Sequence, residues 1–184
     1  MSAAVDATES RLLELLKLVN DWLKFAEAKN VGIVGLASGA MSVLLVALGF
    51  LREAGLTLVS SLFVGAGAAC LAVSLLIGVY SFFPATAMPR WMRMRLEPPR
   101  ADDNLYFFGH AAKYDPTSLA VAVARRYERT PDPVVGALHT DLAAQLIVNA
   151  RITMQKLRLF RWSVGFFGAG VVLAGVGLVL IAVF

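Results

Sequence analysis

The stretch VGIVGLASGAMSVLLVALGFL, residues 31–51, contains no charged side chain and decides the class of this protein. Two more uncharged stretches follow it in the chain, residues 54–83 and 162–184. Each of the three has at least the roughly 20 apolar residues that a helix needs to cross a bilayer. Of the 184 residues, 58% are hydrophobic and only 16% are charged, which leaves too little polar surface for a soluble globular protein. We therefore predict an all-α integral membrane protein with three transmembrane helices and a small helical cytoplasmic region.

Outward from these stretches, the chain divides into six segments. We assign residues 1–30 to a cytoplasmic amphipathic helix, 31–51 to transmembrane helix 1, 52–56 to an external hairpin, 57–83 to transmembrane helix 2, 84–161 to a cytoplasmic ligand-sensing segment, and 162–184 to transmembrane helix 3. The polar segments are too small to form a large core of their own.

The basic residues indicate the orientation in the membrane. Of the 17 lysines and arginines, four precede residue 31, twelve lie between residues 90 and 161, and Arg52 alone lies in the hairpin. Positive charge beside a span is retained on the cytoplasmic side. We therefore expect a multi-pass protein whose N-terminus and 84–161 segment are cytoplasmic and whose C-terminus is external.

The N-terminal segment carries apolar residues at alternating steps of three and four, a heptad seam. The seam consists of Leu12, Leu15, Val19, Trp22 and Ala26. Because no proline separates it from residue 31, we expect one helix to continue into the membrane. Two alternatives stay open, a coiled coil that joins protomers and an intrachain contact with a helix over residues 139–161.

The cytoplasmic segment is divided by its prolines. Four of them between residues 84 and 99 exclude a regular helix there. The arginines of the same stretch, together with the apolar side chains of Trp91, Met92 and Met94, suit the anionic headgroup layer, and contact of these arginines with a nucleic acid or phosphate is the alternative. Asp115 and Pro116 are typical of the N-cap and first residue of a helix, which we expect to extend to about Arg129. No proline follows residue 139, so one helix is predicted to run from the cytoplasm through the third span.

Two groups of side chains in this segment are candidates for binding a ligand. Aromatic rings in residues 104–110 offer stacking surfaces for a base. On the 139–161 helix, amides suit a base edge and cations suit a phosphate. The predicted ligand-binding residues are Asn104, Phe107, Phe108, His110, Gln145, Asn149, Arg151 and Lys156. The alternative roles are an aromatic core for the first group and a solvated helix face for the second.

The sequence does not favour catalysis. His110 and His139 are the only histidines, and the single cysteine, Cys70, lies within the second span. A metal-dependent hydrolase and a nucleotide-fold enzyme would lack their characteristic residues. No ionisable side chain other than Cys70 and Tyr80 lies within a span, and ion-coupled transport normally needs a charged group there. We expect no catalytic residues, no cofactor and no metal.

Small residues within the spans favour close helix packing and an oligomer. The predicted packing positions are Gly35, Gly39, Gly65 and Gly170. Hydroxyl side chains in the spans offer a lining for a narrow water path, although such hydroxyls also bond to their own helix backbone. These hydroxyls belong to Ser38, Ser42, Ser60, Ser61 and Ser74.

Two stretches of the chain are similar to those of a known family. They are residues 104–114 (NLYFFGHAAKY) and 141–161 (DLAAQLIVNARITMQKLRLFR). Together with the order of two spans, a cytoplasmic segment and one span, they resemble the Pycsar transmembrane effector family of bacterial antiphage defence. The resemblance covers almost the whole chain. It rests on the Asn-Leu-x-Phe-Phe-Gly phrase and on the run that begins at Asn149 and ends at Lys156.

The resemblance implies a function. In that family a cyclic pyrimidine mononucleotide, cyclic UMP or cyclic CMP, is made by a partner cyclase or nucleotidyltransferase during infection. It triggers a homo-oligomeric effector that permeabilises the bacterial inner membrane as an ion channel or pore, which causes abortive infection. Two alternatives remain: a channel that a nucleotide or oligonucleotide holds closed, and a passive membrane scaffold that docks a soluble partner.

Overall fold

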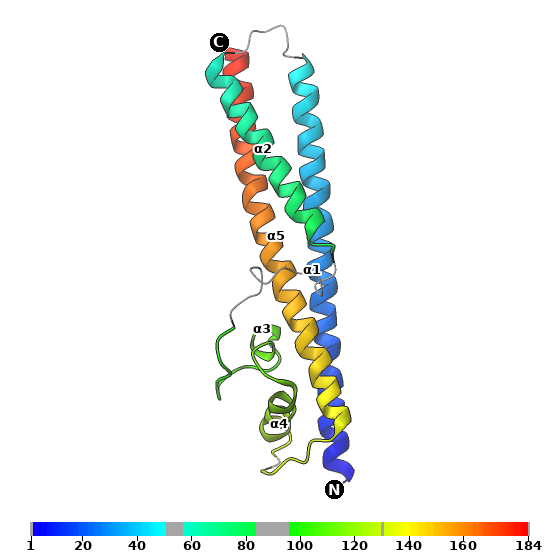
Figure 1. Cartoon of the computed structure of the whole chain (residues 1–184). Coiled ribbons are helices and arrows are strands. Elements are labelled where there is room, and N and C mark those ends of the chain that lie inside the picture. The colour runs from blue at the N-terminus through cyan, green and yellow to red at the C-terminus, as the bar shows by residue number, and fades with distance from the viewer. Residues whose placement is uncertain (1, 51–56, 84–95, 130, 184) are drawn as a thin grey trace. The chain divides into compact units, whose positions relative to one another are not determined.

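The computed structural model describes residues 2–50, 57–83, 96–129 and 131–183, with side chains from residue 7 onward. Five helices form in these ranges, and no strand is found there (Figure 1). They are α1 (Ser2–Phe50), α2 (Leu58–Tyr80), α3 (Phe108–Ala111), α4 (Pro116–Tyr127) and α5 (Ala137–Val183). The all-α prediction is confirmed. The predicted hairpin 52–56 and the basic stretch up to residue 95 lie outside the described residues.

Two of the helices are long, as the absence of proline predicted. α1 has 49 residues and passes residue 31 without a break, and α5 has 47 residues and passes residue 162. Helices α1, α2 and α5 each contain a stretch long and apolar enough to cross a membrane.

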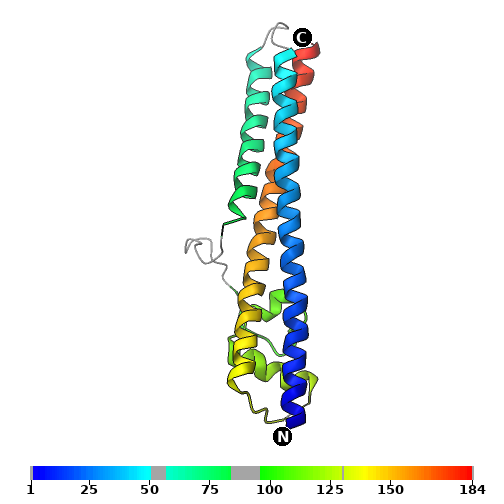
Figure 2. The same ribbon diagram turned by 90° about the vertical axis from the view of Figure 1, so that its right-hand side faces the viewer.

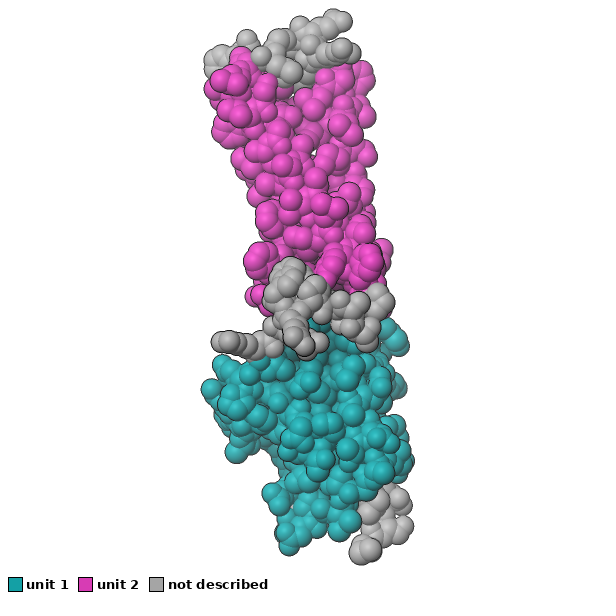
Figure 3. Space-filling model, in the orientation of Figure 1, with its two compact units in different colours: residues 1–26, 85–156 teal, residues 27–84, 157–184 magenta. Residues whose placement is uncertain are grey.

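The chain forms two compact units, coloured separately in Figure 3. Unit 1 consists of residues 1–26 and 85–156, and unit 2 consists of residues 27–84 and 157–184. Each unit therefore combines an N-terminal and a C-terminal part of the chain, and each is described separately below.

Unit 2 is built from parts of α1, α2 and α5. Its buried cluster contains Leu44 of α1, Val64 and Leu71 of α2, and Ala174 and Ile181 of α5. All three helices therefore share one apolar core within this unit.

The backbones of α2 and α5 approach closely at glycines. A Cβ on Gly67 would lie 2.5 Å from the backbone nitrogen of Ala174, and one on Gly170 would lie 3.0 Å from the carbonyl oxygen of Gly67. Gly170 is one of the predicted packing positions. The other three, Gly35, Gly39 and Gly65, have no atom within 4 Å of such a Cβ in the single chain, so their role in packing stays a prediction.

Several span hydroxyls are engaged within unit 2. Ser60 and Ser74 are fully buried. Ser60 donates to the carbonyl of Thr57, and Ser42 donates to the carbonyl of Ser38 at 3.0 Å. The hydroxyls of Ser42, Ser60 and Ser74 are thus bonded within the unit, and a water path lined by the five predicted hydroxyls stays a prediction.

Unit 1 places the first part of α5 beside the N-terminal part of α1, as both views show (Figures 1 and 2). Leu12, Leu15 and Val19 of the heptad seam are at most 3% exposed, and Ala26 is fully buried. Trp22 is the exception, with 39% exposure. Because the chain itself covers most of the seam, the structure supports the intrachain alternative for these positions.

Candidate functional site

Helix α4 begins as its sequence predicted. The Asp115 carboxylate accepts a hydrogen bond from the backbone N–H of Ser118 at 3.0 Å, and Pro116 is the first helical residue. The helix ends at Tyr127, slightly before the predicted end at Arg129, whose φ of 52° is left-handed and incompatible with a continuing helix.

The aromatic group of predicted ligand residues is largely internal to unit 1. Phe108 is 7% exposed, and its ring centroid lies 5.5 Å from that of Trp22 and 4.8 Å from that of Phe107. His110 accepts a hydrogen bond from the backbone N–H of Asn104 through Nδ1 at 2.9 Å. Phe107 keeps 46% of its surface exposed and contacts His110 edge-on. In this group, Phe107 thus offers the most ring surface to a ligand.

The predicted helix residues are engaged with other parts of unit 1. Gln145 donates to Asn149 at 3.2 Å, and Asn149 donates to the side-chain oxygen of Asn20 on α1 at 2.7 Å. Lys156 is buried. The amide side chains of Gln145 and Asn149 therefore connect α5 to α1 through Asn20.

Arg151 holds the chain between α3 and α4. Its Nε donates to the carbonyl of Ala112 at 2.9 Å and its Nη2 to the carbonyl of Tyr114 at 3.3 Å. The guanidinium thereby fixes the short connection between α3 and α4 to α5.

Asp103 organises the turn that precedes α3. Its carboxylate, 3% exposed, accepts from Lys113 Nζ at 2.8 Å and from the Arg100 backbone N–H at 2.9 Å. Burial acts to raise the pKa of Asp103, but these hydrogen bonds and the charge of Lys113 outweigh it, so the pKa lies below its usual value. The Asp103 carbonyl accepts from the Arg126 guanidinium of α4. The turn is thus fixed against α4.

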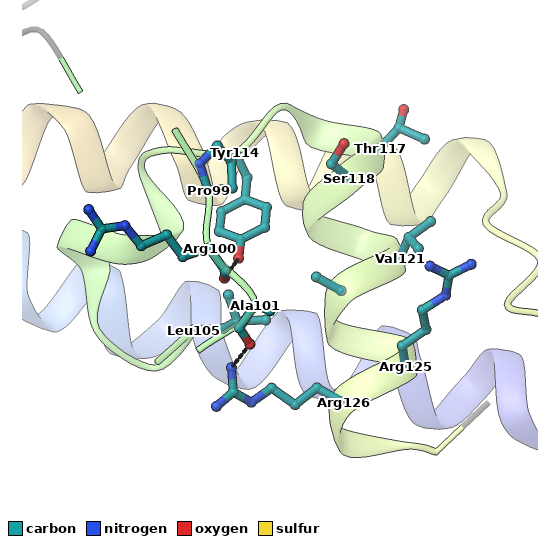
Figure 4. Close-up of a pocket in the computed structure, with 11 residues that line it drawn as sticks. Pro99, Arg100, Ala101, Leu105, Tyr114, Thr117, Ser118, Val121, Arg125 and Arg126 are labelled. Carbon is teal, nitrogen blue, oxygen red and sulfur yellow. Dashed lines mark hydrogen bonds between the residues drawn. The ribbon is translucent and has the colours of Figure 1, made fainter. Parts of the chain in front are cut away.

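Beside this turn lies a groove of about 820 Å³, which we call the α4 groove (Figure 4). It is lined by Pro99, Arg100, Ala101, Leu105, Tyr114, Thr117, Ser118, Val121, Ala122, Arg125 and Arg126. Tyr114 is buried and donates its hydroxyl to the carbonyl of Arg100 at 3.1 Å. Burial, followed by the charge of Asp103, raises the pKa of Tyr114, so the hydroxyl keeps its proton at neutral pH.

The three arginines of the α4 groove differ in the hydrogen bonds and ion pairs that their side chains make. Arg126 donates to the carbonyls of Ala101 and Asp103, and Arg100 pairs with the exposed Glu97 at 3.3 Å. Arg125 is exposed and has no side-chain partner among the described residues. Of the three, Arg125 is therefore the arginine whose N–H groups make no side-chain hydrogen bond to the described residues.

A smaller groove of about 420 Å³ lies next to the first and shares Pro99 and Tyr114 with it. Arg151 lines it, and is the only one of the eight predicted ligand residues that lines either groove. Within the described ranges, no group of three His, Cys, Asp or Glu side chains is placed to hold a metal ion.

The α4 groove is not among the sites predicted from the sequence. A usable signal was present, since Ser118, Val121, Ala122 and Arg125 follow the i, i+3, i+4, i+7 spacing of one helix face. This face mixes a hydroxyl, two small apolar side chains and one cation, and it matches no standard motif.

Comparison with known proteins adds one result. Residues 11–183 match the family described as the Pycsar effector protein domain. Neither the curated proteins nor the solved structures that were compared gave a match.

Proposed function

This chain belongs to the Pycsar effector family, and we propose that it senses a cyclic nucleotide and then permeabilises the membrane in which it lies. Membership assigns it to the effectors of antiphage defence, which work with a cyclic nucleotide made by a cyclase. Its three long apolar helices make it a multi-pass membrane protein.

One observation carries the proposal, namely the extent of the family match. The match over residues 11–183 includes both compact units, so one family domain combines a polar unit that has two grooves with a unit built from three apolar helices. An effector that receives a soluble signal and acts on a bilayer needs both parts.

The finer proposal concerns ligand, topology and outcome. The ligand is cyclic UMP or cyclic CMP from a partner cyclase or nucleotidyltransferase, and unit 1 lies in the cytoplasm while the C-terminus is external to the inner membrane. Support for this orientation comes from the basic residues, most of which lie outside the spans on one side of the predicted topology. A homo-oligomer then forms an ion channel or pore and causes abortive infection, with no catalytic step, cofactor or metal.

A leakage assay tests this function. Purified protein is reconstituted into liposomes loaded with a self-quenched dye, and cyclic UMP or cyclic CMP is added. We expect release within minutes, whereas linear UMP, which has the same base and a phosphate but no cyclic ester, serves as the control and should release far less.

The same assay separates the alternatives. A channel held closed by a nucleotide leaks before any addition and seals when the nucleotide is present. A passive scaffold leaks under neither condition. Either result contradicts the proposed function.

A further inference from the structure

We propose that the α4 groove is the binding site for the nucleotide, with the phosphate at Arg125 and the base over Val121 and Ala122. The class of ligand rests on the proposed function, whereas its placement rests on the geometry of unit 1. The predicted residues in the stretch 104–110 and on α5 then shape the unit around the ligand instead of contacting it.

The dimensions of the groove suit a mononucleotide. Ser118 and Arg125 are seven residues apart on one face of α4, a separation of about 10 Å at 1.5 Å per residue. A nucleoside monophosphate has a comparable length. The volume of about 820 Å³ lies within the range typical of small-molecule sites.

The charge of the groove suits a phosphate at one end. Arg125 lies in the last turn of α4 and projects from the same end of the helix as Arg126 (Figure 4). Because Arg126 already donates to two backbone carbonyls, Arg125 is the group available for a bidentate contact with phosphate oxygens. A phosphate there also places negative charge beside a guanidinium that lacks a carboxylate partner among the described residues.

The middle and the other end of the groove suit a base. Val121 and Ala122 are half-buried and line the groove, so a flat ring placed over them covers the apolar surface that they leave exposed. The exposed hydroxyls of Thr117 and Ser118 lie in the first turn of α4. A hydroxyl both donates and accepts, so this end of the groove can contact the edge of a pyrimidine.

The test measures binding of cyclic UMP and cyclic CMP to the full-length protein in nanodiscs of phosphatidylcholine. Arg125→Gln removes the cation, and Val121→Glu places a carboxylate where the base would lie. Arg129→Gln is the matched control, because Arg129 is an exposed arginine four residues along the chain that does not line the groove. Thermal unfolding of each variant shows that it is folded.

We expect Arg125→Gln to weaken nucleotide binding by about tenfold or more, the effect of losing a hydrogen bond to a charged group. Val121→Glu should weaken it at least as much, because its carboxylate occupies the place of the base and would be buried against the ligand without a partner. Arg129→Gln should bind like the wild type. If the wild type binds a cyclic nucleotide and both groove variants bind it equally well, the placement is wrong while the proposed function stands. If the wild type binds neither nucleotide, the sensing role fails as well.

A second arm distinguishes a free nucleotide from a lipid headgroup, since both carry a phosphate. The same binding is measured in nanodiscs that contain phosphatidylglycerol, and hydrogen exchange is followed over residues 117–125. Unchanged nucleotide affinity, with protection of α4 only when nucleotide is added, supports the proposal. Protection by phosphatidylglycerol alone, with loss of nucleotide binding, overturns the nucleotide as the occupant.

Discussion

Ser74 on α2 and Ser163 on α5 exchange hydrogen bonds in both directions. Ser74 Oγ donates to the Ser163 carbonyl at 2.8 Å, Ser163 Oγ donates to the Ser74 carbonyl at 2.8 Å, and both residues are fully buried. Serine side chains can hydrogen-bond across membrane helices, and a backbone carbonyl that already accepts within its own helix keeps a second lone pair for such a bond. This pair therefore fixes the register of α2 against α5.

Alanine substitution of this pair should reduce the stability of unit 2. Hydrogen bonds between membrane helices contribute about 0.6 kcal/mol on average and at most about 1.7, so we expect Ser74→Ala and Ser163→Ala each to cost about 1 kcal/mol. The double variant, measured by unfolding in mixed micelles, should lose about the sum of the two, because each alanine removes one donor and leaves the backbone carbonyl that accepts the other bond. Ser42→Ala is the control, since Ser42 is exposed and bonds to its own helix. Single variants that are as stable as the wild type would contradict the two bonds.

Gly67→Ala should separate α2 from α5. The added Cβ would lie 2.5 Å from the backbone nitrogen of Ala174, a distance that only movement of a helix can relieve. We expect a loss of about 1–3 kcal/mol, as for other overpacked sites. Gly65→Ala, two residues away and with no atom within 4 Å, should leave the unfolding midpoint of a monomeric preparation nearly unchanged. Equal effects of the two substitutions would contradict the close approach.

The sequence predicted the fold better than the site. Uninterrupted apolar stretches and the positions of proline are local features, so the existence and length of α1 and α5 and the N-cap of α4 at Asp115 were all predictable. The close contacts of Gly67 were not, because Gly67 and Gly65 look alike in sequence and differ only in what faces them. The contact between Asn149 and Asn20 was not predictable either, because the sequence does not show whether an asparagine side chain bonds to another helix or to a ligand.

Arg151→Lys should loosen the chain between α3 and α4. A lysine ammonium is a point charge on a flexible stem and cannot reproduce the fork that contacts the Ala112 and Tyr114 carbonyls together. We expect a loss of about 1–3 kcal/mol in unfolding free energy. Faster hydrogen exchange over residues 112–115 should accompany it. Because Tyr114 lines the α4 groove, nucleotide affinity should also fall. Hydrogen exchange over residues 112–115 at the wild-type rate would show that the two bonds of Arg151 are dispensable.

Unit 1 should lose stability in acid through Asp103. Its pKa in the folded protein lies below the unfolded value of about 3.9, so its contribution is complete above pH 3.9 and is lost as the pH falls towards the lower folded value. Unfolding is followed by Trp22 fluorescence, with the other two tryptophans replaced by phenylalanine. Between pH 6 and pH 3, Asp103→Asn should show a smaller decline than the parent protein, although it is less stable at pH 6. Parallel pH profiles would exclude Asp103 as the source.

The Asn20 and Asn149 pair should respond differently to single and double substitution. Asn149→Leu alone leaves the side chain of Asn20 without the donor that lies 2.7 Å away, and an unsatisfied polar group in a part-buried position costs about 1–3 kcal/mol. The double variant Asn20→Leu, Asn149→Leu removes both polar groups and adds apolar contact between α1 and α5, so we expect it to recover most of that loss. Thermal unfolding measures both effects, and nucleotide binding by the double variant separates structure from recognition. Binding that stays at the wild-type level assigns Asn149 to the contact between helices, whereas abolished binding by a stable double variant would return Asn149 to the ligand site.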